Sequence, residues 1–203
     1  MSHEASHRAF FDHQAISWDE EESPEKIKIL SHIFNELNFL ATGKILDIGS
    51  GTGILVPIIK SNKAPDNYLV ELDISREMLR VSRNKWEQAR HKLVHLNSDA
   101  QTLPFKDKSF ARIICFAVLP HLSNKMIAFK ECYRVLEDKG QMLILHLMSS
   151  ELLNRFHKDV GGAVENDHLE SAEYLADQVG RIGFRILKSE EKEDLHLVLA
   201  ERM

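Results

Sequence analysis

Short runs of apolar residues alternate along the chain with stretches in which apolar residues recur every three or four positions. The runs indicate buried strands, and the second pattern indicates helices with one apolar face. The predicted strands are residues 44–48, 68–72, 93–97, 111–116, 141–146, 185–189 and 195–201. Strands that alternate with helices are typical of an α/β fold in which helices cover both faces of a doubly wound, mostly parallel sheet.

Helices are predicted between and before these strands, at residues 24–40, 53–60, 75–90, 123–136 and 171–182. Ser75 and Ser123 are candidate N-caps, and Gly140 and Gly183 stand where helix stop signals belong. No repeat or Pro/Gly-rich linker divides the chain, so residues 1–203 are expected to form a single domain. Within it, residues 1–40 are expected to form an N-terminal helical segment that packs on the sheet or covers its edge.

Composition narrows the class of protein. A chain of 203 residues with 43% hydrophobic and 28% charged residues is suited to one globular core, and its net charge of −5 without a basic stripe disfavours nucleic acid as a partner. We expect no membrane span, and residues 1–19 lack the pattern of a signal peptide. Cys115 and Cys132 show no CxxC spacing, which fits a reducing compartment. A cytoplasmic monomer or homodimer is therefore expected.

A glycine-rich turn is the strongest candidate for a binding site. The strand at 44–48 leads into Gly49, Gly51 and Gly53 and then into a helix. Glycine at such a turn lets the chain bend sharply and lets a ligand approach the backbone more closely than a Cβ atom would permit.

The spacing of these glycines argues against a dinucleotide. A nicotinamide-binding turn has the pattern GxGxxG/A, whose third small residue would stand where this chain has Ile54. Asp47 also places a carboxylate near the position that a pyrophosphate would occupy. A ligand without phosphate fits better, and an NAD(P)-dependent oxidoreductase is kept as an alternative.

Two more strand ends carry acidic residues. Asp73 follows the strand at 68–72, and Asp99 follows the strand at 93–97. The carboxyl ends of parallel strands meet at one edge of a sheet, where open α/β folds bind their ligands. A carboxylate at the position of Asp73 can accept both hydroxyls of a ribose, and Asp99 can accept from the exocyclic amine of a purine.

With these motifs, residues 44–146 resemble the class I S-adenosylmethionine-dependent methyltransferases. The resemblance extends to Leu103-Pro104-Phe105 with Ser109-Phe110, to Glu131-Cys132-Tyr133-Arg134-Val135-Leu136 and to Lys139-Gly140-Gln141. It implies a three-layer α/β/α fold with a seven-stranded sheet whose last strand is antiparallel, and S-adenosylmethionine as the co-substrate. A protein that binds this donor without catalysing methyl transfer is a further alternative.

The resemblance also implies which residues bind the donor. Asp47 would brace the glycine loop, Asp73 would bind the ribose, and Asp99 with Ala100 would face the adenine. The family often has glycine at the position of Glu71, so either Glu71 or Asp73 is the ribose ligand, and the strand-end position favours Asp73. The implied donor-binding set is Asp47, Gly49, Ser50, Gly51, Gly53, Asp73, Ile74, Met78, Asp99, Ala100 and Phe116.

Histidines and aromatic residues mark the predicted acceptor side. His121 and His146, which follow the fourth and fifth strands, are candidate catalytic bases because imidazole titrates near neutral pH. Candidate substrate-binding residues are His157, His168, Phe11 and Trp18.

The histidine spacing matches no zinc motif, so no metal is assigned, and metal ligation or a purely structural role stay open as alternatives. Residues 147–170 are expected to form an acceptor-side loop. With no large recognition domain in the chain, a small-molecule acceptor is expected.

Overall fold

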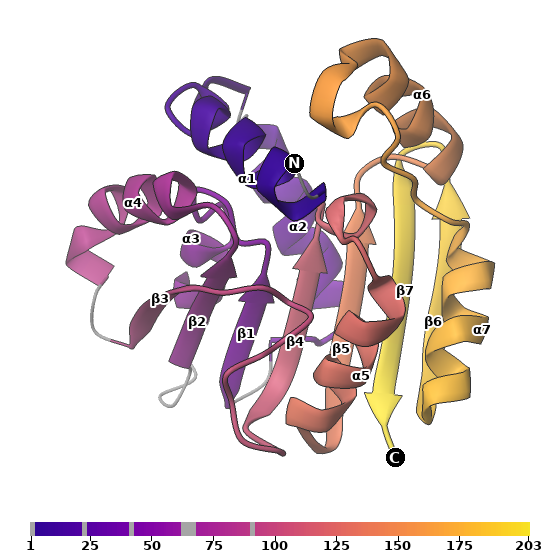
Figure 1. Cartoon of the computed structure of the whole chain (residues 1–203). Coiled ribbons are helices and arrows are strands. Elements are labelled where there is room, and N and C mark those ends of the chain that lie inside the picture. Colours follow the sequence, from indigo (N-terminus) through magenta and orange to yellow (C-terminus); the bar gives the residue numbers. More distant parts are fainter. Residues whose placement is uncertain (1–2, 22–23, 41–42, 62–67, 90–91) are drawn as a thin grey trace.

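Seven strands form one sheet in the computed structural model, which describes residues 3–21, 24–40, 43–61, 68–89 and 92–203 (Figure 1). Their order across the sheet is β3-β2-β1-β4-β5-β7-β6. All neighbours are parallel except that β7 runs antiparallel to β5 and β6, which confirms the predicted sheet. The strands are Lys44–Ile48 (β1), Tyr68–Asp73 (β2), Leu93–Asn97 (β3), Phe110–Phe116 (β4), Leu136–His146 (β5), Phe184–Lys192 (β6) and Leu195–Arg202 (β7).

The apolar strands separate two cores, one on each face of the sheet. Successive side chains of a strand point to opposite faces, so Ile45 and Leu46 of β1 belong to different cores, as do Ile113 and Ile114 of β4. Burial on both faces explains why these strands read as continuous apolar runs rather than as alternating ones.

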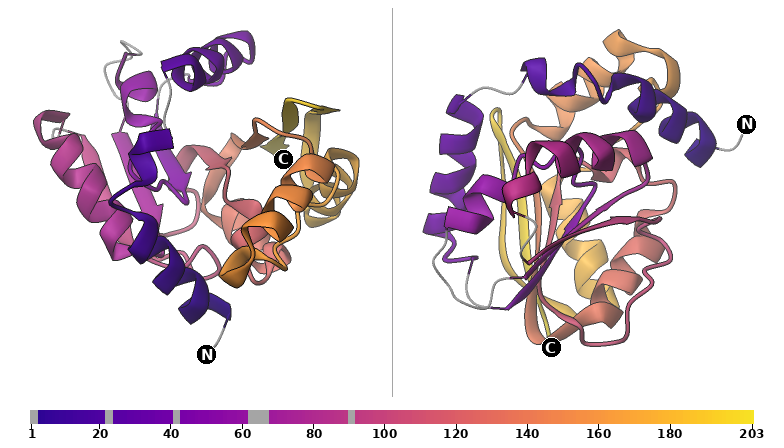
Figure 2. Two further views of the ribbon diagram at one scale, coloured as in Figure 1. Left: turned by 90° about the horizontal axis from the view of Figure 1, so that it is seen from above. Right: turned by 90° about the vertical axis from the view of Figure 1, so that its left-hand side faces the viewer.

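Helices cover both faces and the upper edge of the sheet (Figure 2). Helices α2 (Pro24–Glu36) and α3 (Val56–Ser61) pack in one core, α5 (Lys125–Val135) and α7 (Ala172–Ile182) pack in the other, and α4 (Arg76–Lys85) contacts β2 and β3. Helices α1 (His3–Gln14) and α6 (Ser150–Val160) lie above the carboxyl ends of the parallel strands (Figure 1). Within the described ranges, no helix has the length and apolar character needed to cross a bilayer.

The helix caps were only partly predicted. Ser75 caps α4, since its Oγ accepts from the Met78 N–H at 3.1 Å. Helix α5 is capped by Asn124 instead of Ser123, whose hydroxyl bonds the Gln101 side chain. Gly183 follows α7 as predicted, with φ at +125°.

Gly140 is not a helix stop. Helix α5 has already ended at Val135, and Gly140 lies inside β5. A Cβ atom there would come within 2.8 Å of the Glu137 carbonyl oxygen and within 3.2 Å of that of Ala111. The glycine therefore permits close backbone packing.

Several predicted boundaries also differ from the structure. The helix expected at 53–60 begins only at Val56, because the glycine turn occupies the preceding residues. The helix expected at 75–90 ends at Lys85 and is followed by the 3₁₀ turn Glu87–Ala89, while residue 90 lies outside the described part of the chain. The predicted loop at 147–170 contains α6 and the 3₁₀ turn Gly162–Val164, so describing it as a loop was wrong.

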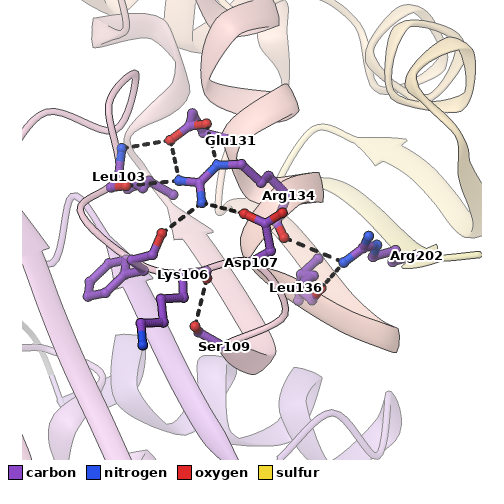
Figure 3. A network of polar contacts seen from close by, with 9 residues as sticks. Leu103, Lys106, Asp107, Ser109, Glu131, Arg134, Leu136 and Arg202 are labelled. Atoms are coloured by element: carbon purple, nitrogen blue, oxygen red, sulfur yellow. Dashed lines mark hydrogen bonds and ion pairs between the residues drawn. The ribbon is translucent and has the colours of Figure 1, made fainter.

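A polar network fastens the segment between β3 and β4 to helix α5 (Figure 3). The Arg134 guanidinium donates to the carbonyl oxygens of Leu103 at 2.9 Å and Phe105 at 2.7 Å, and to the Asp107 carboxylate at 2.9 Å. Glu131 accepts from Arg134 at 2.7 Å and from the Leu103 N–H at 2.9 Å. The hydrogen bond to Glu131 is the main cause of a raised pKa for Arg134. The motif residues of this region thus position the chain that follows β3.

Candidate active site

A cavity opens at the carboxyl ends of the central strands, where the strand order reverses between β1 and β4. This is the position at which open α/β sheets bind ligands. The glycine turn after β1 and Asp73 at the end of β2 form part of its wall, and Asp99 after β3 and Phe116 at the end of β4 form another part.

The three glycines of the turn have positive φ angles, +69° at Gly49, +57° at Gly51 and +85° at Gly53. A Cβ atom on Gly49 would collide with Val118, and one on Gly53 would come within 2.8 Å of Glu71 and Trp86. A Cβ atom on Gly51 would meet only the indole nitrogen of Trp18, at 3.9 Å, which is an ordinary van der Waals contact. Packing therefore requires glycine at 49 and 53, whereas Gly51 leaves its backbone open to the cavity.

Asp73 holds this turn in place. Its Oδ2 accepts from the Gly51 N–H at 2.9 Å and its Oδ1 accepts from the Ser75 N–H at 2.8 Å. Burial raises the pKa of this carboxyl group to about 6, although the two backbone hydrogen bonds oppose the rise. The bracing of the glycine loop that was assigned to Asp47 is thus a contact of Asp73.

Asp47 has a different environment. It is 1% exposed, it lines the cavity, and its Oδ1 has no hydrogen-bond partner among the described residues. Burial, followed by the nearby carboxylates Glu71 and Asp73, raises its pKa well above the usual value. A buried carboxylate without a partner is costly on its own and suits a cationic ligand group.

Glu71 does not face the cavity. Its Oε2 accepts from the Ser82 hydroxyl at 2.7 Å and pairs with His95 Nε2 at 2.8 Å, beneath helix α4. Of the two carboxylates considered for the ribose, only Asp73 lines the cavity.

Helix α1 and the segment after it form the roof of the cavity. Asp12 accepts from the Ser75 hydroxyl at 2.6 Å and from the Glu77 N–H at 3.2 Å, which docks α1 on the start of α4. This placement brings Phe11 and Trp18 into the cavity wall, with their ring centroids 5.8 Å apart.

Beside the cavity, the imidazoles of His7 and His121 contact one carboxylate, and both histidines line the cavity wall. Asp167 accepts from His7 Nε2 at 2.8 and 2.9 Å through its two oxygens, and from His121 Nδ1 at 2.5 Å. We call these three residues the His7–His121–Asp167 cluster. The His7 and Asp167 side chains are 3% and 2% exposed, and His121 is 17% exposed. Although burial opposes it, hydrogen bonds from His121 and His7 lower the pKa of Asp167 to about 2.

His157 lies directly behind this cluster. Its ring centroid is 5.2 Å from that of His121, and its Nδ1 lies 3.4 Å from the Asp167 carbonyl oxygen. Burial, followed by the neighbouring His121, lowers the pKa of His157.

The family-model comparison matches residues 46–144 to a methyltransferase domain. Residues 46–144 are a methyltransferase domain of the class I S-adenosylmethionine-dependent type. This assignment agrees with the glycine spacing that argued against a dinucleotide, and it does not support the oxidoreductase alternative.

Curated relatives carry the same assignment. The chain is 33% identical over 105 residues to a demethylmenaquinone methyltransferase of Thermotoga maritima, covering 52% of this chain and 44% of the relative. It is 30% identical over 148 residues to a ubiquinone/menaquinone biosynthesis C-methyltransferase of Haemophilus ducreyi, covering 67% and 57%. The chain thus matches about half the length of these relatives.

A solved structure supports the fold independently. The crystal structure of an S-adenosylmethionine-dependent methyltransferase from Aquifex aeolicus superposes with a TM-score of 0.70 at 19% identity, covering 90% of this chain and all of that one.

The family's co-substrate, S-adenosylmethionine, fits the cavity wall. The donor carries an ammonium and a sulfonium, and the unpartnered Asp47 carboxylate is a complement for positive charge. The open backbone at Gly51 leaves room for close approach of a ligand. Asp73 keeps lone pairs on both oxygens beside its two backbone contacts, so it can still accept from ribose hydroxyls.

The cavity brings together most of the residues that the sequence assigned to the donor and acceptor. Asp99 and Ala100 line it together, and the Asp99 Oδ1 accepts from the Gln101 N–H at 2.8 Å. The remaining assigned residues in its wall are Asp47, Gly49, Ser50, Gly51, Asp73, Ile74, Met78, Phe116, Phe11, Trp18 and His121.

Four assigned residues lie away from the cavity wall. Gly53 packs against its neighbours below the turn, and His168 is exposed on the surface. His157 is buried behind His121. His146 is buried at the end of β5, where burial and then His196 lower its pKa well below the usual value.

Sequence reasoning missed two residues of the cluster. His7 lies one helical turn before Phe11, and that spacing was the only local signal that both share a face of α1. Asp167 belongs to a stretch that was singled out as acceptor-side, yet nothing near it in sequence indicates its partners, which are 46 and 160 residues away.

Proposed function

We propose that the chain transfers the methyl group of S-adenosylmethionine to a small-molecule acceptor that lies between the donor and the His7–His121–Asp167 cluster. One observation carries this proposal: the same cavity is lined by the glycine turn and Asp73 and also by Phe11 and His121. A donor and an acceptor bound in it would be held side by side and shielded from water, which are the main requirements of an in-line displacement.

The donor supplies a methyl group on a positively charged sulfur. The acceptor's electron pair forms the new bond to carbon, the carbon–sulfur bond breaks, and its electrons remain on sulfur in S-adenosylhomocysteine. An acceptor atom that carries hydrogen, whether oxygen, sulfur, nitrogen or a ring carbon, must also lose a proton to give the neutral methylated product. Of the two histidines proposed as catalytic, His121 is the one supported by position, because it lines the cavity whereas His146 does not.

The curated relatives support an aromatic acceptor such as a quinol ring, since their names refer to quinone biosynthesis. Phe11 and Trp18 agree with this class, because aromatic side chains in the cavity roof offer stacking surfaces to a planar ring. The acceptor is therefore proposed to be a small aromatic compound with a hydroxyl group.

Release of S-adenosylhomocysteine tests the proposal. The purified chain is incubated with S-adenosylmethionine and a panel that contains hydroquinones, simple phenols, thiols and amines. Donor-dependent product formation with a hydroquinone or phenol, lost in His121→Gln and retained in His13→Gln, supports the proposal. His13 is a matched control, because it is an exposed histidine on the same helix as His7. Donor binding without turnover on the whole panel would favour the non-catalytic alternative.

A further inference from the structure

We propose that the His7–His121–Asp167 cluster is a binding site for one divalent first-row transition-metal ion, with Zn²⁺ as the representative. His7 Nε2, His121 Nδ1 and a carboxylate oxygen of Asp167 all lie within 4.8 Å of one another. Tetrahedral coordination with metal–ligand distances of about 2.0–2.2 Å places ligand atoms roughly 3.3 Å apart. The two imidazole–carboxylate contacts, at 2.8 and 2.5 Å, are shorter than this spacing and would lengthen around an ion.

The donor set has the right chemistry. Two imidazole nitrogens and one carboxylate oxygen are ligands that zinc and neighbouring metals accept, and sites with three protein ligands leave coordination positions open. Asp167 supplies the carboxylate oxygen, which is the anionic member of the ligand set. Both imidazoles already point a ring nitrogen at it.

The surroundings hold the three side chains in place. The Asp167 N–H donates to the Val164 carbonyl oxygen at 3.0 Å, closing the turn that follows α6. The ring of Phe11 stands edge-on to His121 at 5.0 Å and covers one side of the cluster. His157 Nδ1 contacts the Asp167 carbonyl oxygen and so supports the backbone of the carboxylate ligand. Such outer contacts orient metal ligands.

The open side of the cluster faces the acceptor. His7 and His121 line the same cavity as the glycine turn, whereas Asp167 closes the cluster from behind. An ion held here lowers the pKa of an oxygen or sulfur atom that approaches it from the cavity. This step rests on the proposed function, and it predicts an acceptor with a hydroxyl or thiol group that can ligate the ion.

Hydrogen bonding without an ion also accounts for the distances between Asp167 and the two histidines. Two neutral imidazoles can each donate one N–H to the Asp167 carboxylate, and this satisfies the nitrogens without an ion. His7 and His121 lie 160 and 46 residues from Asp167 in the sequence, and both contact its carboxylate. A structural contact with Asp167 needs only one of the two histidines, so the presence of both favours a metal site. Metal titration distinguishes the two arrangements.

The experiment uses the full chain after treatment with a chelator, without any methyl donor. Calorimetric titration with Zn²⁺ is expected to show one ion per chain and a rise in melting temperature. His121→Gln and Asp167→Asn are each expected to weaken binding by about 100-fold or more, since even outer contacts of metal sites are worth 10–100-fold. His13→Gln is expected to bind as the unchanged chain does. Absence of binding, or weak binding that all variants share, overturns the metal site.

Two further measurements separate this proposal from the proposed function. Titration of the metal-free variants with S-adenosylhomocysteine shows whether they still fold and bind the donor product. The Co²⁺-loaded chain is then mixed with phenol or 2-mercaptoethanol, and its visible absorption is recorded. A spectral change with either compound supports the acceptor class, and no change with both overturns that class even if the ion itself binds.

Discussion

Replacing Asp73 by alanine tests whether one carboxylate both holds the glycine turn and binds the donor. The change leaves the N–H groups of Gly51 and Ser75 without their acceptor. Each unsatisfied buried donor costs about 1–3 kcal/mol. In the opposite direction, a pKa raised to about 6 means that the ionised carboxylate destabilises the fold by roughly 3 kcal/mol at neutral pH. We therefore expect the free energy of unfolding to change by no more than about 3 kcal/mol.

Donor affinity is expected to fall much more clearly than stability. Loss of charge-assisted hydrogen bonds from Asp73 to the ribose weakens binding by about 1.5–3 kcal/mol, which is roughly a 10- to 150-fold change in dissociation constant. Disorder of the Gly51 backbone adds to this loss, because the same carboxylate positions the turn. Calorimetry with S-adenosylhomocysteine at pH 7.5 measures the change, and thermal melting shows whether the variant is folded.

Glu71→Gln is the matched control. Glu71 lies two residues earlier on β2, is also buried, and pairs with His95 away from the cavity. The Glu71→Gln substitution is expected to lower the free energy of unfolding and to leave donor affinity within about twofold of that of the unchanged chain. Unchanged affinity in Asp73→Ala, or an equal loss in both variants, would refute the assignment of the ribose to Asp73.

Two further predictions concern the cavity, and a third concerns the network around Arg134. Donor affinity is expected to fall up to tenfold per pH unit below pH 6, because the raised pKa of Asp73 means that its carboxylate becomes protonated there. Calorimetry at several pH values checks this. Gly51→Val is expected to abolish detectable donor binding in calorimetry, since it adds a side chain at φ +57° beside the cavity. Arg134→Leu is expected to lower the free energy of unfolding by about 3 kcal/mol in urea titration, because Glu131 and two carbonyl oxygens lose their partner.

The donor end of the site could be predicted because its signals are local. The glycine turn, Asp73 and Asp99 each follow a recognisable buried strand, and the parallel sheet brings strand ends together without further information. Competition between neighbouring capping residues explains the error at the start of α5. Ser123 and Asn124 are both good capping residues, and the cap lies one residue later than expected because the Ser123 hydroxyl bonds Gln101.

Helix α6 was missed although its signals are present. Ser149 caps it, Gly161 ends it with φ at +70°, and Leu152, Phe156 and Val160 recur at helical spacing. By contrast, the His7–His121–Asp167 cluster depends on tertiary contacts alone, since no residue near Asp167 in sequence indicates that α1 will pack beside it.

The donor is easier to identify from sequence than the acceptor, because donor residues follow local signals whereas the proposed acceptor side depends on tertiary contacts. The family match spans residues 46–144, which include the donor wall and His121. His7 and Asp167 lie on either side of that span, on α1 and in the turn after α6, and these two segments meet above the sheet edge. The proposed acceptor side therefore includes segments that lie outside the matched domain. His121 lies inside the matched domain and contacts Asp167 outside it, so it connects the two parts of the proposed site.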